Sequence, residues 1–201
     1  MKTLLNFTFT LIFIAINLHG GNLSANSGGL EKGEAAPDFT AIDQNGKSVT
    51  LSKKLAEGPV VVIFYRGQWC PLCSRHLGAL QDSLHLLTEK GAIVLAVSPE
   101  KQEFLQKTAE KANASFTLLY DKDYQIMQDY RVAFAPDAEE KEMYNNRLNA
   151  QFEVAHANPE VLLPVPATYI IDTNGKIVFK HYNPDYRVRA SVREMLENLP
   201  E

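Results

Sequence analysis

The chain contains only two cysteines, Cys70 and Cys73, and two residues separate them. Two thiols at this spacing can close into a disulfide and open again, so the pair can exchange electrons with a partner. Arg66 lies four residues before the first cysteine, and a nearby cation favours the thiolate form of a thiol. The sequence therefore predicts redox chemistry at sulfur.

A strand and a helix must position this pair. Residues 59–65 form a continuous apolar and β-branched run between Gly58 and Gly67, which is typical of a strand buried on both faces. After the pair, leucines recur at three- and four-residue spacing up to Gly91, which predicts a helix with one apolar face that ends there. These leucines are Leu77, Leu80, Leu84 and Leu87.

The cysteines should lie at the beginning of this helix. Cys70 is expected near the N-cap, Pro71 at the first helical position, where its missing N–H costs nothing, and Cys73 in the first turn. The positive end of the helix dipole and the free N–H groups stabilise a thiolate at this place. We expect a thiol pKa below that of a free cysteine, and we expect Arg66 to lower it further.

Other uses of the cysteines remain open. An inert disulfide would close a very short loop and stabilise the fold little. A zinc site needs four ligands, and the sequence offers one CxxC motif with His76 and His85 further along the same helix. Both thiols with a distant His156 or His181 would suit Cu(I), because soft thiolates bind that ion well. We nevertheless expect no metal and no other cofactor.

Composition indicates one globular domain with a real core, since 45% of the 201 residues are hydrophobic. The net charge of −4 gives no indication of nucleic-acid binding. Lys2 and the apolar stretch 4–18 predict a secretory signal peptide cleaved near Ala25, so that residues 1–27 comprise this peptide and a flexible linker. We thus expect an exported, periplasmic or secreted protein that contacts a membrane only if this segment stays uncleaved.

The rest of the chain alternates strands and helices, which predicts an α/β fold. An Asn45-Gly46 turn should connect an N-terminal hairpin. Further strands are expected over residues 92–98, 116–120, 163–172 and 177–182, and helices over 100–111, 124–130 and 188–199. Asp123 is the expected cap of the helix over 124–130. A charged, partly helical insertion at about 134–163 either covers a site or extends into solvent.

This order of elements and three motifs resemble the thioredoxin fold, and more narrowly the CxxC-containing, peroxiredoxin-like branch of the alkyl hydroperoxide reductase and thiol-specific antioxidant family. The motifs are residues 36–39 (APDF), 64–73 (FYRGQWCPLC) and 165–172 (VPATYIID) followed by 174–176 (NGK). The resemblance implies a central mixed sheet flanked by helices, with an N-terminal hairpin extension, in one domain over residues 31–201. It also implies a cis Pro166 beside the cysteines.

The resemblance leaves the attacking sulfur open. The peroxiredoxin pattern of Pro, three residues, Thr, two residues and Cys assigns the peroxidatic role to Cys73, with Arg66 and Cys70 at the proline and threonine positions. The basic residue that peroxiredoxins have near the later strand has no counterpart in residues 164–167. The thioredoxin pattern instead assigns the attack to Cys70, expected to be the more exposed, although thioredoxin's buried acid is missing from residues 60–65.

By resemblance we predict an antioxidant thiol oxidoreductase that reduces hydroperoxides. Cys73 would attack the peroxide, become a sulfenic acid and condense with Cys70, and a thioredoxin-like or other dithiol would reduce the disulfide. The alternative is an exported protein-disulfide reductase in which Cys70 attacks. A protein that binds Cu(I) without turnover is a third possibility. The sequence does not fix the oligomeric state.

Six further side chains are candidates for this site or its surroundings. Trp69, Pro166 and Arg66 are expected to bind the substrate. His76 is expected at the surface. Arg187 or Arg189 could supply a charge to the site, but a solvated helix start is the preferred interpretation for both.

Overall fold

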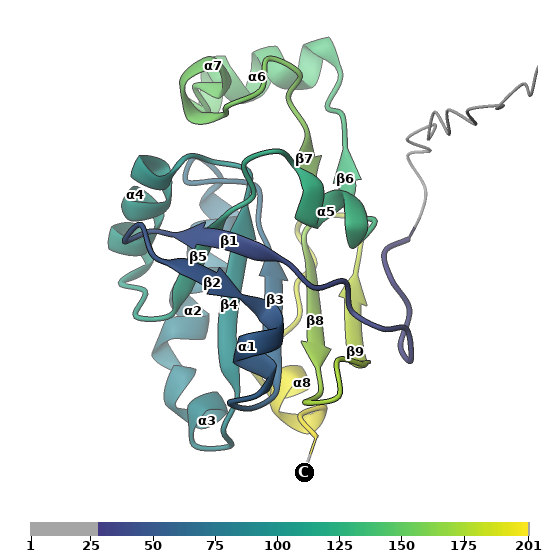
Figure 1. Ribbon diagram of the computed structural model, residues 1–201. Helices are drawn as coiled ribbons and strands as arrows, with labels where there is room; N and C mark the ends of the chain where they lie inside the picture. Colours follow the sequence, from purple (N-terminus) through teal and green to yellow (C-terminus); the bar gives the residue numbers. More distant parts are fainter. Residues whose placement is uncertain (1–27, 201) are drawn as a thin grey trace, which may run out of the picture.

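The computed structural model describes residues 28–200, and its centre is a seven-stranded sheet in the order β2-β1-β5-β4-β3-β8-β9 (Figure 1). β3 pairs in parallel with β4, and β4 with β5, whereas the other neighbours in this sheet are antiparallel. The mixed α/β sheet and its N-terminal hairpin confirm the predicted thioredoxin-like fold. The strands are β1 Thr40–Asp43, β2 Ser48–Thr50, β3 Val60–Phe64, β4 Ile93–Ser98, β5 Thr117–Tyr120, β8 Ala167–Ile171 and β9 Ile177–Tyr182.

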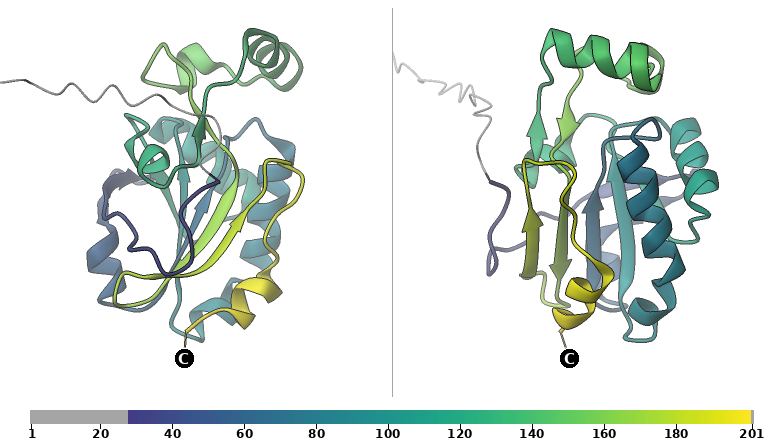
Figure 2. Two further views of the ribbon diagram at one scale, coloured as in Figure 1. Left: turned by 90° about the vertical axis from the view of Figure 1, so that its right-hand side faces the viewer. Right: turned by 180° about the vertical axis from the view of Figure 1, so that it is seen from behind.

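Helices cover both faces of this sheet. They are α1 Leu51–Leu55, α2 Pro71–Asp82, α3 Leu84–Thr88, α4 Gln102–Ala112, α5 Gln125–Asp129, α6 Ala138–Leu148, α7 Phe152–Ala155 and α8 Val192–Glu197. Seen from behind, α2 and α8 lie in front of the strands, whereas α1 and α5 lie on the opposite face (Figure 2).

β3 contributes to the hydrophobic core on both faces, as its continuous apolar run predicts. Val61 and Ile63 pack in one cluster with residues of α2, α4 and α8. Val60, Val62 and Phe64 pack in the other cluster with residues of α1 and α5. Successive side chains of a strand point to opposite faces, so one strand fills both cores. The segment that follows β3 therefore begins at a fixed point, the carboxyl end of a central strand.

The insertion forms a small structure of its own. β6 Ala133–Phe134 pairs antiparallel with β7 Leu163–Pro164, and α6 and α7 lie between them in the chain (Figure 1). A capping box between Asp137 and Glu140 fixes the beginning of α6. The insertion reaches back to the CxxC turn, since the ring of Tyr144 lies 4.8 Å from that of Trp69 between centroids. The insertion therefore covers the CxxC turn and does not simply extend into solvent.

Several local predictions were wrong. The helix after the cysteines is two helices, because Ser83 (φ −114°, ψ 10°) leaves the helical conformation between α2 and α3. Asp123 does not cap α5, because Asp121 accepts the N–H groups of Ile126 and Met127 instead. The expected strand over 163–172 is divided between two sheets, as β7 and β8.

Two further expectations concern the peptide bond before Pro166 and the N-terminal segment. No peptide bond in residues 28–200 is cis, so the bond before Pro166 is trans and the cis proline implied by the resemblance is wrong. The expected signal peptide and linker, residues 1–27, lie outside the described residues. Across residues 28–200, none of the helices has the length and apolar character needed to span a bilayer.

Candidate active site

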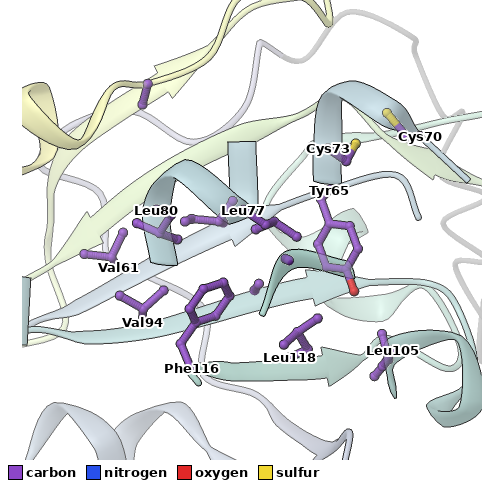
Figure 3. Close-up of a cluster of buried hydrophobic side chains, with 14 of the residues drawn as sticks. Val61, Tyr65, Cys70, Cys73, Leu77, Leu80, Val94, Leu105, Phe116 and Leu118 are labelled. Carbon is purple, nitrogen blue, oxygen red and sulfur yellow. The ribbon is translucent and has the colours of Figure 1, made fainter. Parts of the chain in front are cut away.

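Both cysteines lie at the beginning of α2, where the sequence predicts them (Figure 3). Cys70 is the N-cap residue, Pro71 takes the first helical position, and the Cys73 N–H donates to the Cys70 carbonyl at 3.0 Å. Both thiols are free. Cys70 is 0% exposed and Cys73 1% exposed, so the expectation that Cys70 is the more exposed is wrong. The reason is the cover that the insertion and its aromatic rings form over the turn.

Arg66 is the cation closest to Cys70. Its Nη2 lies 3.4 Å from the Cys70 sulfur, and its Nη1 donates to the Tyr144 hydroxyl at 3.1 Å. The guanidinium carbon is 4.0 Å from the ring centroid of Tyr186 and 5.1 Å from that of Trp69. The residue is 3% exposed, and none of the ion pairs in residues 28–200 includes it. A buried cation needs a compensating negative group, and the Cys70 thiolate can be that group.

The two thiols differ in their preference for charge. The hydrogen bond from the Cys73 thiol, followed by the charge of Arg66, lowers the pKa of Cys70 to about 5 against the effect of burial. Burial raises the pKa of Cys73, and its role as hydrogen-bond donor to Cys70 raises it further. The thiolate thus forms on Cys70, and the proton stays on Cys73. The peroxiredoxin pattern assigns the two roles the other way round, with Cys73 as the attacking thiolate.

A second arginine approaches the other sulfur. Nη2 of Arg189 lies 3.9 Å from the Cys73 sulfur, whereas Arg187 pairs with Asp185 at 2.8 Å. The expectation of a solvated position is wrong for Arg189. His76 is also not a simple surface residue, because its Nε2 lies 3.0 Å from the Ala190 carbonyl oxygen and thereby attaches this C-terminal segment to α2.

A pocket lies next to Arg66. Its volume is about 260 Å³, and it is lined by Arg66, Phe134, Ala135, Glu140, Tyr144, Val165, Pro166, Tyr182, Pro184 and Tyr186. Pro166 and Arg66 thus line the same pocket, and neither cysteine is among its lining residues. Four of the five predicted site residues, Arg66, Trp69, Cys70 and Cys73, meet at the CxxC turn, and the fifth, Pro166, lines the pocket next to this turn.

The metal alternatives have no assembled ligand set. His156 lies away from the thiols, where its Nδ1 is 3.0 Å from the Tyr124 hydroxyl. Within the part of the chain that the structure describes, no three His, Cys, Asp or Glu side chains are grouped so that they could hold a metal ion.

Sequence reasoning missed Glu100, Tyr144 and Tyr186. Glu100 is fully buried, and its Oε2 accepts the Gln68 N–H at 2.7 Å. Burial raises the pKa of this carboxyl to about 8. Its place directly after a buried strand was a usable signal, because the carboxyl ends of neighbouring parallel strands lie at the same edge of a sheet. No spacing in the sequence links the two tyrosines to the cysteines.

Comparisons with known proteins show the family of this chain. Residues 32–180 match the AhpC/TSA family. Peroxiredoxin Q, chloroplastic, from Oryza sativa subsp. japonica is 29% identical over 172 residues, which are 86% of this chain and 68% of the rice protein. Peroxiredoxin Bcp from Escherichia coli K12 is 36% identical over 103 residues, 51% of this chain and 65% of that protein.

Solved structures show the same fold at lower identity. Peroxidoxin BcpB from Mycobacterium tuberculosis superposes with a TM-score of 0.61 at 23% identity, over 76% of this chain and 86% of that one. Reduced Prx3 from Vibrio vulnificus superposes with a TM-score of 0.66 at 16% identity, over 84% and 97% of the two chains.

The comparisons contradict the expected export to the periplasm or out of the cell. The plant relatives are named as chloroplastic, a location inside an organelle. The expectation depended on the apolar pattern of residues 4–18, which lie outside the described residues. Nothing in the described structure therefore supports it.

Proposed function

Because the chain belongs to the AhpC/TSA family and is a peroxiredoxin-like oxidoreductase, we propose that it reduces hydroperoxides through Cys70 and Cys73, with Cys70 as the attacking thiolate. The observation that best supports this proposal is the contact of 3.4 Å between Arg66 Nη2 and the Cys70 sulfur in a buried site. A thiolate is the nucleophile in such chemistry, and a fixed guanidinium stabilises it.

In the first step, the Cys70 thiolate attacks one oxygen of the hydroperoxide. A sulfur–oxygen bond forms, the O–O bond breaks, and the leaving alkoxide or hydroxide takes up a proton to become an alcohol or water. Arg66 is close enough to stabilise the negative charge that moves from sulfur to the leaving oxygen. The product on the protein is a Cys70 sulfenic acid.

In the second step, Cys73 resolves this intermediate. The Cys73 sulfur attacks the sulfenic sulfur, a disulfide forms, and the hydroxyl group leaves as water once it has taken up a proton. Arg189, at 3.9 Å, favours the Cys73 thiolate that this attack requires. A thioredoxin-like or other dithiol then supplies two electrons and restores both thiols.

Stopped-flow measurement of hydrogen peroxide consumption by the reduced protein tests this proposal. We expect a fast reaction in the wild type and in Cys73→Ser, which should accumulate a Cys70 sulfenic acid that a dimedone probe traps. Cys70→Ser should lose the fast phase. A wild type that reacts no faster than a free thiol would overturn the peroxidase proposal, and loss of the fast phase only in Cys73→Ser would reverse the two roles.

Protein-disulfide reduction is a second candidate function. The observation that favours it is the combination of a low pKa on Cys70 and a protonated, buried Cys73, which is the order that a disulfide reductase needs. In this case Cys70 attacks a protein disulfide and Cys73 releases the product. Trapping of a mixed disulfide on Cys70 in Cys73→Ser, together with a slow peroxide reaction, would favour this function over the first.

A further inference from the structure

Glu100 is a buried carboxyl that neither step above uses. It lies two residues after β4 and is 0% exposed. Its Oε2 accepts the Gln68 N–H at 2.7 Å, and its Oε1 has no hydrogen-bond partner. An ionised carboxylate is costly in such a place unless a cation neutralises it. The carboxyl is therefore neutral at neutral pH, and it carries a proton directly beneath the CxxC turn.

No ion pair in residues 28–200 includes Glu100. Lys111, on α4, donates instead to the Gln68 carbonyl and side chain. The ionisable groups around Glu100 are Tyr65 after β3, Cys70 on the CxxC turn, and Lys107 and Lys111 on α4. The two lysines favour the carboxylate, whereas a thiolate on Cys70 disfavours it.

Because Gly67 has no side chain, the unpaired Oε1 of Glu100 can lie close to the backbone of the turn. A Cβ atom at Gly67 would lie 2.5 Å from Glu100 Oε1 and 2.6 Å from Trp69 Nε1. Trp69 Nε1 is itself a buried donor without a partner, and so is Arg66 Nε. Three unpaired polar atoms therefore belong to residues on or beside the CxxC turn. Such atoms are rare in folded proteins and need an explanation, and proton exchange is one.

We propose that Glu100 exchanges a proton with each redox cycle of the pair, releasing it when Cys70 and Cys73 form a disulfide and taking one up when the disulfide is reduced. This inference rests on the proposed redox pair but not on peroxide as its oxidant. Glu100 contacts the turn and not the sulfurs, so it is a positioning residue.

The proton balance fits the proposed reaction. A Cys70 thiolate, a Cys73 thiol and a neutral Glu100 together lose two electrons and two protons and become a disulfide and a Glu100 carboxylate. A hydroperoxide needs two electrons and two protons to become an alcohol and water. The buried negative charge moves from Cys70 to Glu100, so the site holds one such charge in both redox states. Each charge disfavours the other, which is the coupling that the proposal requires.

Equilibration with reduced and oxidised dithiothreitol at pH 6 to 8 tests the inference. The small dithiol releases two protons per disulfide reduced. In Glu100→Gln only Cys73 takes one of them up, so the equilibrium constant for reduction should rise about tenfold per pH unit. In the wild type Glu100 takes up the second proton, so the equilibrium constant should rise less steeply with pH. Between pH 6 and pH 8, the ratio of the equilibrium constants of Glu100→Gln and the wild type should therefore change by roughly threefold or more. A threefold change corresponds to a difference of about half a unit in the pKa of Glu100 between the two redox states. Equal slopes would overturn the inference.

A control variant and an NMR titration complete the test. Glu103→Gln removes an exposed carboxylate from α4, the helix that follows Glu100 in the chain, and should keep the wild-type slope. If Glu100→Gln does not fold, the carboxyl carbon of Glu100 can be titrated by NMR in the wild type. Its pKa should be at least half a unit lower in the oxidised protein than in the reduced protein, and equal values would overturn the inference. Neither measurement uses peroxide, so a protein that does not reduce peroxide leaves both tests intact.

Discussion

The guanidinium of Arg66 lies 3.4 Å from the sulfur of Cys70, and both residues are buried. Because water does not screen either group, each stabilises the charge of the other. Arg66 has taken the position at which the peroxiredoxin pattern has proline, and Cys70 the position of its threonine. At these two positions the chain thus has a guanidinium in contact with a thiol whose pKa it lowers.

Arg66→Met tests this contact. Without the cation, the hydrogen bond from Cys73 alone opposes the effect of burial, so the pKa of Cys70 should rise by about one unit or more. A raised pKa removes thiolate at low pH, so for a rise of about one unit we expect the peroxide rate to fall about fivefold at pH 5 and about twofold at pH 6, and to recover as the pH rises. Stopped-flow rates from pH 5 to 9 measure both limbs of this profile.

Arg75→Gln is the matched control for Arg66→Met, because it removes an exposed arginine from α2. It should leave the pH profile unchanged. An unchanged profile in Arg66→Met would mean that the helix N-terminus and Cys73 suffice to hold the thiolate.

Tyr144→Phe and Tyr186→Phe separate a hydroxyl from a ring. The Tyr144 hydroxyl accepts a hydrogen bond from Arg66, whereas Tyr186 contacts the guanidinium through its ring. Loss of the first hydroxyl leaves a buried donor unpaired, at a cost of about 1–3 kcal/mol, and should lower the peroxide rate several-fold. Tyr186→Phe keeps the ring and should keep the rate. Equal effects in both variants would contradict the assignment of the hydroxyl.

Arg189→Gln should affect the resolving step alone. Its loss removes a cation that lowers the pKa of Cys73, so less thiolate is available to attack the sulfenic acid. We expect disulfide formation to slow by about tenfold while the initial peroxide reaction keeps its rate. Rapid-quench thiol counting after one turnover separates the two steps. Arg187→Gln, which removes an arginine paired with Asp185, serves as the control.

The sequence predicts the strand and helix around the cysteines because the signals are local. An apolar run of seven residues, four of them β-branched, and Pro71 directly after Cys70 act within a few residues of the place that they determine. The partners of the sulfurs are not local. Arg66 meets Tyr144 across 78 residues, and Cys73 meets Arg189 across 116 residues. Periodicity and spacing contain no information on such contacts, so these side chains could not be placed.

The burial of Cys70 illustrates the same limit. A cysteine at a helix N-terminus after a glycine turn is expected to face solvent. Here the ring of Trp69 packs on Tyr144 and on Phe152 of the insertion, with centroids 4.8 and 5.6 Å apart. The exposure of the thiol thus depends on a segment more than 60 residues away in sequence, whose charged composition permits a solvated excursion equally well.

Glu100 should make the stability of the protein depend on pH. Burial raises the pKa of this carboxyl to about 8, whereas an unfolded glutamate titrates near 4.3. The folded state therefore binds the proton more tightly. The resulting stabilisation, relative to a folded state with an ionised Glu100, is fully present below pH 4 and is lost as the pH rises to 8. The slope between these limits approaches 1.4 kcal/mol per pH unit.

Glu100→Gln stays neutral at every pH and keeps an acceptor for the Gln68 N–H, so it should not lose this stability. We expect the difference in the free energy of unfolding between Glu100→Gln and the reduced wild type to grow in favour of the variant from pH 5 to pH 8. Urea titrations at unit steps of pH measure it, with Glu103→Gln as a control that should follow the wild type. A difference that stays constant over this range would mean that the Glu100 carboxyl is already ionised in the folded protein. In that case it could not release a proton when the disulfide forms.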